Sequence, residues 1–215
     1  MILLIGIEKG GTGKSTLATN LATLRTRAGR DVLLVDADKQ MTSSYWAARR
    51  DELGHTPRIV CTQKRGKAIH EDLRDFAQRY DDIIVDAGGQ DSLELRSAMV
   101  VADRLCIPFQ PSQADMWTLE TMAELVTQVG LINPGLDVQV VINRATTHPR
   151  VPEVEEAVAG LADFPELPYA DVVLRERRAF RKAMTLGIAV AELDPPDAKA
   201  IAELDHLYQT LYADA

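Results

Sequence analysis

Cysteine is scarce in this sequence, and the two cysteines that it has stand far apart. Cys61 and Cys106 each lie in an apolar run, and the chain has no Cys-x-x-Cys pair. Structural zinc sites and iron–sulfur clusters are built from closely spaced cysteines, so we expect neither here. Isolated cysteines in apolar runs are typical of reduced core thiols, which indicates a cytoplasmic protein.

Long apolar runs and an excess of positive charge are missing as well. The first apolar run is short and has no basic residues before it, so we do not expect a signal peptide. No stretch approaches the roughly 20 apolar residues that a membrane span needs. A net charge of −8 argues against a generally basic nucleic-acid-binding protein, although it does not exclude a local basic face.

Features that divide a chain into domains are also absent. No linker rich in proline, glycine or serine, no repeat and no low-complexity tract interrupts the 215 residues, of which 46% are apolar. A chain of this length and composition can bury one sizeable core, so we expect residues 1–215 to form one domain.

A glycine-rich turn, Lys9-Gly-Gly-Thr-Gly-Lys-Ser-Thr16, directly follows the apolar run of residues 2–7. A buried strand that enters such a turn and continues into a helix is the setting of a phosphate-binding loop, although a glycine-rich corner without a ligand is the alternative. Backbone amides of the turn and of the helix start would hold the phosphates. Lys14 is then expected beside the β- and γ-phosphates and Ser15 on Mg²⁺. The expected nucleotide-binding residues are Gly10, Gly11, Thr12, Gly13, Lys14, Ser15 and Thr16.

The turn departs from the general phosphate-binding pattern at its start. Glu8 stands where that pattern has glycine, and a second lysine, Lys9, follows it. A further cation is redundant within one chain, but it can reach a nucleotide that a facing subunit holds. Lys-Gly-Gly-x-Gly-Lys-Ser with this additional "signature" lysine resembles the deviant Walker A loop of the ParA/MinD ATPases. The resemblance implies a homodimer that forms on ATP with two nucleotides between its subunits.

Aliphatic runs alternate with helical patterns along the whole chain. Runs at residues 32–35, 83–85, 104–108 and 138–142 predict strands, and the spacing of apolar residues after Leu17, Ile69 and Leu119 predicts helices between them. Continuous aliphatic strands indicate a mostly parallel, twisted sheet that helices cover on both faces. The predicted fold is therefore the α/β P-loop NTPase fold, with its site at the carboxyl ends of the strands.

Acidic residues follow two of these strands. Asp36-Ala-Asp38-Lys-Gln resembles the Asp-x-Asp-Pro-Gln segment of the ParA/MinD family, with Lys39 in place of proline, and Asp86 matches a Walker B acid. The resemblance implies that Asp38 positions the attacking water, and that Asp36 and Asp86 support Mg²⁺. Two turn acids after a strand are the alternative for the first pair. Gly88-Gly89 is expected to act as a switch that senses the γ-phosphate.

Resemblance alone extends the expected site to three further segments. It implies that Asn143, at the end of a strand, and the loop at Pro168 flank adenine. It also places residues 107–115 near the dimer face. Trp117, beside that segment, is either an interface residue or an exposed aromatic residue.

One tract, Arg175-Glu-Arg-Arg-Ala-Phe-Arg-Lys182, is strongly basic. As a helix it would present a cationic face to DNA phosphates without reading sequence, as ParA proteins do when ATP is bound, or it would be a solvated face. The expected DNA-binding residues are Arg175, Arg177, Arg178, Arg181 and Lys182. The last helix, expected to start at Asp194, is acidic, which argues against the membrane anchor of MinD-like proteins.

The interpretation that best fits these features is a ParA-like partition ATPase. It would dimerise on ATP, use Mg²⁺, bind DNA non-specifically on the nucleoid, and hydrolyse ATP slowly until a ParB-like or small adaptor protein stimulates it. A related ATPase that positions a protein cargo is the first alternative. A dethiobiotin-synthetase-type ligase is the second, and its ATP turnover would depend on a small carboxylate or amine.

Overall fold

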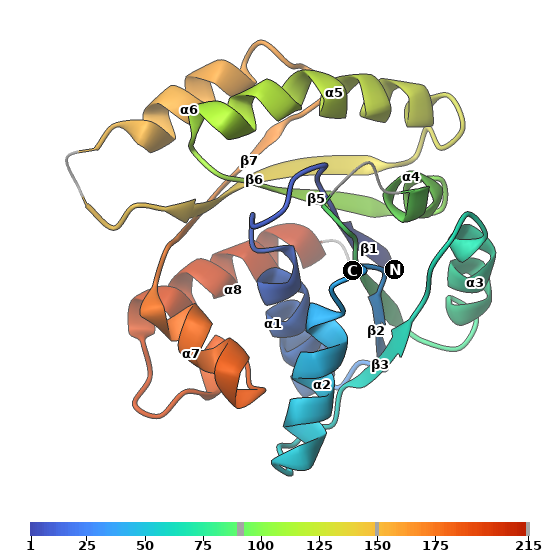
Figure 1. The fold of residues 1–215 in the computed structure, drawn as a ribbon, viewed down its shortest axis with the longest axis vertical. Helices are drawn as coiled ribbons and strands as arrows, with labels where there is room; N and C mark the ends of the chain where they lie inside the picture. Colours follow the sequence, from blue (N-terminus) through green and yellow to red (C-terminus); the bar gives the residue numbers. More distant parts are fainter. Residues whose placement is uncertain (90–92, 149–150, 214–215) are drawn as a thin grey trace.

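A seven-stranded parallel sheet runs through the centre of the molecule in the computed structural model, which describes residues 1–89, 93–148 and 151–213 (Figure 1). The strand order is β3-β2-β4-β1-β5-β6-β7, and every neighbouring pair is parallel. The strands are β1 (Ile2–Ile5), β2 (Val32–Asp36), β3 (Val60–Gln63), β4 (Asp82–Asp86), β5 (Arg104–Phe109), β6 (Asp137–Ala145) and β7 (Tyr169–Arg175).

Helices cover both faces of this sheet, as the aliphatic strands predicted. One face carries α3 (Ile69–Phe76), α4 (Leu93–Met99), α5 (Gln113–Gly130) and α6 (Glu153–Leu161). The other carries α1 (Lys14–Arg27), α2 (Thr42–Glu52), α7 (Arg178–Leu186), the 3₁₀ helix η1 (Val190–Glu192) and α8 (Ala198–Tyr212). Strand β1 shows why two cores form: Ile2 and Leu4 belong to one core and Leu3 and Ile5 to the other, since successive side chains point to opposite faces.

Two predicted segments differ from the structure. The final helix begins at Ala198 instead of Asp194, because the Asp197 carboxylate caps it by accepting from the backbone N–H groups of Lys199 and Ala200 at 3.2 and 3.1 Å. The basic tract is not one helix: Arg175 ends β7 and α7 starts only at Arg178. The spacing of Asp91 and Glu94 also predicts a capping pair at the start of the helix that follows Gly88-Gly89, and Asp91 lies outside the described residues.

The outer strands were not predicted. β3 is an edge strand with no fully buried residue, and the burial of β7 alternates along its length. Neither therefore shows the continuous aliphatic run that identifies a strand buried on both faces.

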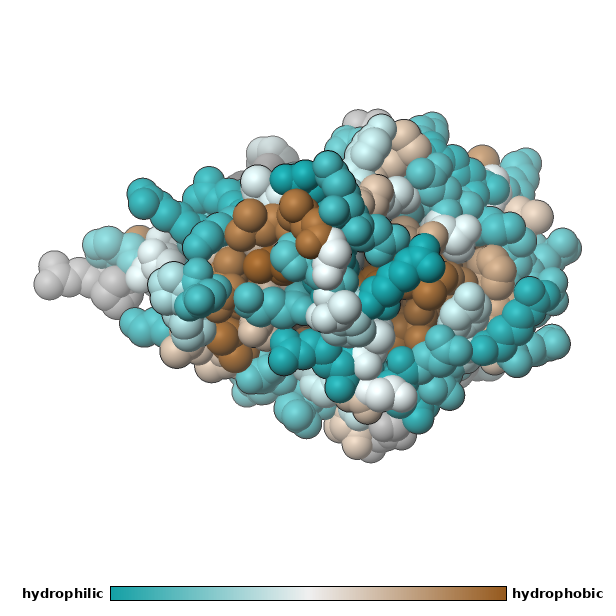
Figure 2. All heavy atoms as spheres, turned by 90° about the horizontal axis from the view of Figure 1, so that it is seen from below, coloured by the Kyte–Doolittle hydropathy of each residue, from teal (hydrophilic) through white to brown (hydrophobic). Residues whose placement is uncertain are grey.

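Polar side chains form most of the face seen from below in Figure 2, and hydrophobic atoms show in recesses between them. Across the described ranges, no helix is both long enough and apolar enough to cross a membrane.

Candidate nucleotide-binding site

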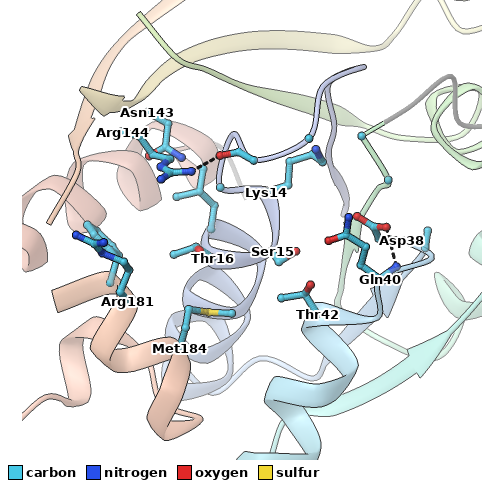
Figure 3. Close-up of a pocket in the computed structure, with 18 of the residues that line it drawn as sticks. Lys14, Ser15, Thr16, Asp38, Gln40, Thr42, Asn143, Arg144, Arg181 and Met184 are labelled. Carbon is cyan, nitrogen blue, oxygen red and sulfur yellow. Dashed lines mark hydrogen bonds between the residues drawn. The ribbon is translucent and has the colours of Figure 1, made fainter. Parts of the chain in front are cut away.

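A cavity of about 830 Å³ opens at the carboxyl edge of the sheet, where the phosphate-binding loop (Lys9–Thr16) follows β1. Figure 3 shows the start of α1 in the middle, with Asp38 and Gln40 on one side and Arg181 and Met184 of α7 on the other. Residues from the carboxyl ends of β2, β4, β6 and β7 thus line one hollow, because parallel strands end at the same edge.

Glycine is required in the loop for a steric reason that goes beyond backbone freedom. Gly13, the N-cap residue of α1, has φ 93°, and a Cβ there would lie 2.4 Å from the Asn143 amide nitrogen. That amide donates to the Thr12 carbonyl at 2.7 Å, and Asn143 is buried. Strand β6 therefore supports the loop from below. Asn143 also lines the cavity, in keeping with the expectation that it lies beside a nucleotide. Its side-chain amide nitrogen, however, already donates to the Thr12 carbonyl.

Lys14 is nearly buried, and its ammonium donates to the carbonyl of Lys9 at 2.6 Å. Burial lowers the pKa of Lys14, and the negative charges of Asp86 and Asp38 act against this shift. A desolvated cation beside exposed loop amides suits the phosphates of a nucleotide.

Asp86, at the end of β4, is fully buried, and one of its oxygens accepts from the Ser43 hydroxyl at 2.7 Å. The other oxygen has no hydrogen-bond partner among the described residues. Burial raises the pKa of Asp86 to about 7, helped by the charge of Asp36, while the Ser15 and Ser43 hydroxyls and Lys14 oppose the shift. An orphaned carboxylate oxygen near a loop serine fits Mg²⁺, which favours oxygen ligands and would supply the missing positive charge.

Asp36 and Asp38 play different structural parts. Asp36 is fully buried, and its carboxylate accepts from the backbone N–H groups of Asp38 and Ser44 at 3.1 and 2.7 Å. Asp38 lines the cavity, and its carboxylate accepts from the Gln40 N–H at 2.9 Å (Figure 3). Asp36 therefore shapes the turn that presents Asp38.

Arg65, from the loop after β3, also holds this turn. Its guanidinium donates to the Asp38 carbonyl at 2.9 Å. Lys39 occupies the place where the ParA/MinD segment has proline. Hydrogen bonds therefore hold the backbone of this turn, which a proline ring would otherwise restrain. Sequence reasoning missed Arg65, because no local pattern links it to a residue 27 positions earlier.

Lys9 forms an ion pair with Asp115 of α5, with 2.5 Å between Nζ and Oδ2. Asp115, the last residue of the segment expected near the dimer face, thus contacts the phosphate-binding loop, and the position of this segment at a dimer face stays a prediction. Trp117, on the next turn of α5, is 73% exposed. Gly89 packs on the same part of the loop, since a Cβ there would lie 2.6 Å from the Lys9 carbonyl oxygen and 2.7 Å from the Gly10 nitrogen.

Arg144, which sequence reasoning did not single out, links the loop to the segment after β7. Its guanidinium donates to the Gly11 carbonyl and to the Glu176 carboxylate, the latter at 2.6 Å. Its φ of 56° marks an unusual backbone conformation directly after Asn143.

The expectation for Pro168 conflicts with the structure. Pro168 precedes β7 at the strand's amino end, and its carbonyl accepts from the Val140 N–H at 2.9 Å within the sheet. The residues that reach the cavity follow the other end of β7, at Arg175, Glu176 and Arg177. The part of β7 and its flanks that lines the cavity is therefore the β7–α7 connection, and Pro168 is not among the residues of the cavity wall.

The five expected DNA-binding residues separate into two groups. Arg175 donates to the Thr146 carbonyl at 2.5 Å, Arg177 pairs with Glu203 at 2.5 Å, and both line the nucleotide cavity. Arg178, Arg181 and Lys182 are exposed on α7, although Arg181 also lies in the cavity wall, 3.4 Å from Glu176. Arg175 and Arg177 are therefore engaged with partners in the same chain, and the exposed cations of the predicted DNA-binding set are Arg178, Arg181 and Lys182.

A parallel sheet whose first strand runs into a glycine-rich loop, with a buried acid ending the neighbouring strand, is the framework of a P-loop nucleotide-binding protein. The sequence model of the protein family described as the CobQ/CobB/MinD/ParA nucleotide binding domain matches residues 3–190, so the chain belongs to this family.

Similar curated proteins extend over nearly the whole chain. Maintenance of carboxysome distribution protein A of Halothiobacillus neapolitanus is 26% identical and covers 93% of this chain and 90% of its own length. The protein of the same name in Gloeobacter kilaueensis is 31% identical, with 92% and 87% covered.

Solved structures share the fold. The D38A variant of Cyanothece McdA in complex with ATP has a TM-score of 0.81 at 16% identity, covering 98% of this chain and 96% of its own. MinD of Pyrococcus horikoshii with Mg-ADP has a TM-score of 0.73 at 20% identity, with 99% and 95% covered. The expected cofactors, ATP and Mg²⁺, agree with these complexes and with the residues of the site.

Proposed function

We propose that this protein is an ATPase that dimerises on ATP, is reset by hydrolysis, and positions a large protein assembly in the cell. The observation that carries the proposal is Lys9, a second lysine at the mouth of a loop whose own cation, Lys14, already serves the phosphates. The choice of a protein cargo over DNA is supported by the two relatives named for carboxysome distribution. Such a cargo requires an adaptor protein other than a ParB-like one.

Hydrolysis in this proposal needs little covalent chemistry from the protein. Asp38 would orient the attacking water, while Ser15, Asp36 and Asp86 support Mg²⁺ and Lys9 of one subunit reaches the nucleotide of the other. Orientation and charge neutralisation account for most of the catalysis in phosphoryl transfer.

The Lys9→Ala variant tests the dimer. It should bind ATP as the parent does, because the phosphate contacts of Lys14 remain, but it should stay monomeric in light scattering and release phosphate slowly. Lys39→Ala is the matched control, since it removes a different lysine, one that lines the cavity. Normal dimerisation of the Lys9 variant would refute the role in trans.

DNA partition is the second candidate, and the exposed cations of α7 favour it. Arg178 and Lys182 lie four residues apart on one helix and outside the cavity wall. In a dimer two such pairs would contact DNA phosphates together, so binding should depend on ATP and weaken steeply with salt. Bound DNA would place the ATP form on the nucleoid.

A double substitution, Arg178→Ala with Lys182→Ala, separates these candidates. It should abolish sequence-independent DNA binding without changing ATP affinity, whereas Arg74→Ala with Arg79→Ala, an equal charge change on and after α3, should not. Absence of DNA binding by the parental ATP dimer at low salt would exclude a DNA-based function. ATP turnover that depends on a small carboxylate or amine would instead indicate a metabolic ligase.

A further inference from the structure

The carboxylate that holds Lys9 is built into the fold. The Asp115 side chain is fully buried, while the Lys9 side chain is 27% exposed. Asp115 is the third residue of α5, and its N-cap residue Ser112 donates its hydroxyl to the same carboxylate oxygen that Lys9 contacts. The Asp115 N–H in turn approaches the Ser112 hydroxyl oxygen at 3.3 Å. The N-cap residue of α5 therefore fixes the carboxylate that receives the Lys9 ammonium.

This pairing has a consequence for charge. A lysine whose ammonium contacts a buried carboxylate presents little net positive charge to a phosphate outside its own subunit. The charges facing the pair are those of the same loop and of α4: Glu8 precedes Lys9 and pairs with Arg96 at 2.9 Å, and Lys14 donates to the Lys9 carbonyl. None of these groups takes the place of Asp115 at the Lys9 ammonium.

Asp115 also keeps stabilising contacts when Lys9 leaves. It stands in the first turn of α5, where the helix dipole favours a negative charge, and it retains the Ser112 hydroxyl. Its second oxygen is buried and has no hydrogen-bond partner among the described residues. The ion pair can therefore open without leaving a fully uncompensated buried charge, which would be costly.

We propose that Asp115 is a positioning residue for Lys9: it holds the ammonium in the single chain and gives it up when a facing subunit offers the phosphates of its nucleotide. The inference rests on the proposed function, because it assumes that Lys9 acts in trans. Dimerisation then replaces the contact of Lys9 with Asp115 by a contact of Lys9 with the phosphates of the facing subunit. Asp115 therefore sets the concentration of ATP-bound protein at which two chains associate.

Removing the carboxylate should free Lys9. In Asp115→Asn the side chain keeps its shape and its place at the helix start but loses the charge that competes with the partner's phosphates. We expect the ATP-bound variant to dimerise about tenfold more tightly, a difference of about 1.4 kcal/mol. The affinity of the single chain for ATP should stay unchanged, because Asp115 is not part of the cavity wall.

Amine labelling tests the hold on Lys9 without reference to dimerisation. Nucleotide-free protein is treated briefly with acetic anhydride, and the modification of Lys9 relative to exposed Lys39 is measured by mass spectrometry. Asp115→Asn should raise this ratio severalfold. Glu8→Gln is the matched control, since it removes one negative charge beside Lys9 without removing its partner, and it should leave the ratio unchanged.

Light scattering of the same proteins with Mg-ATP completes the test, and Asp115→Ser serves as a second variant if the first is poorly folded. Raised labelling together with tighter dimerisation supports the proposal. Unchanged labelling, an equal rise in Glu8→Gln, or raised labelling with unchanged dimerisation overturns it. If the parent itself never dimerises on ATP, the proposed function fails, and the labelling ratio alone decides whether Asp115 holds Lys9.

Discussion

Replacing Asp86 by asparagine should stabilise the nucleotide-free protein above neutral pH. The carboxyl group is fully buried at the end of β4, and burial raises its pKa from 3.8 to about 7. The folded chain therefore binds this proton more tightly than the unfolded chain does. Stability from the group is fully present below about pH 4 and is lost as the pH rises to about 7.

The size of the effect follows from the shift in pKa. Each pKa unit corresponds to about 1.4 kcal/mol, so a shift of roughly three units lowers the free energy of unfolding by about 4 kcal/mol across that window. The asparagine variant does not titrate, and its amide can still accept from the Ser43 hydroxyl that contacts Asp86 at 2.7 Å. The free energy of unfolding of the variant should consequently not fall between about pH 4 and 7 in the way that the parent's does.

Urea unfolding of both proteins at pH 5, 6, 7 and 8, without nucleotide or Mg²⁺, measures the difference directly. The contributions of other titrating groups cancel between the two curves, so the variant should gain on the parent by about 3 kcal/mol between pH 5 and 8. Added Mg-ATP should reverse the order at pH 8, because only the parent offers the cation a carboxylate at position 86. Parallel pH profiles would show that the buried charge is already compensated and would refute the reasoning.

Three further substitutions test other parts of the site and fold. Lys14→Ala should abolish nucleotide binding in a fluorescence titration, and binding within a few-fold of the parent would mean that the loop amides suffice. Asp38→Ala should slow phosphate release by orders of magnitude while an ATP-bound dimer persists, and hydrolysis at the parental rate would assign the water to another acid. Arg50→Ala removes a fully buried guanidinium that contacts both oxygens of Glu192 at 2.8 Å; it should lower the free energy of unfolding by about 3–5 kcal/mol, and a loss below 1 kcal/mol in urea would contradict a structural role.

The parts of the site that sequence predicted are those whose chemistry is local. The loop from Gly10 to Thr16 is recognisable because its amides, Lys14 and Ser15 act through fixed spacing along the chain. The central strands are equally legible, since burial on both faces demands continuous aliphatic runs. Asp36 and Asp86 could be located because parallel strands bring their carboxyl ends together.

The parts that sequence missed depend on contacts between distant residues. Lys9 and Asp115 are 106 positions apart, and Arg144 and Gly11 are 133 apart. No periodicity encodes such pairs, because helix packing on the sheet decides them. The division of the basic tract was missed for a related reason, because charge along a sequence does not say that Arg177 pairs with Glu203 while Arg178 faces solvent.

The contact of Gly89 with the loop makes two segments one mechanical part. Because no Cβ fits between Gly89 and the Lys9 carbonyl, the segment after β4 cannot advance without displacing the oxygen that accepts from Lys14. Packed interiors transmit such displacements rather than absorbing them. A phosphate that draws the Lys14 ammonium away from this carbonyl therefore also alters the contact between Gly89 and the loop. Any other residue at position 89 would act as a wedge between the two and hold them permanently apart.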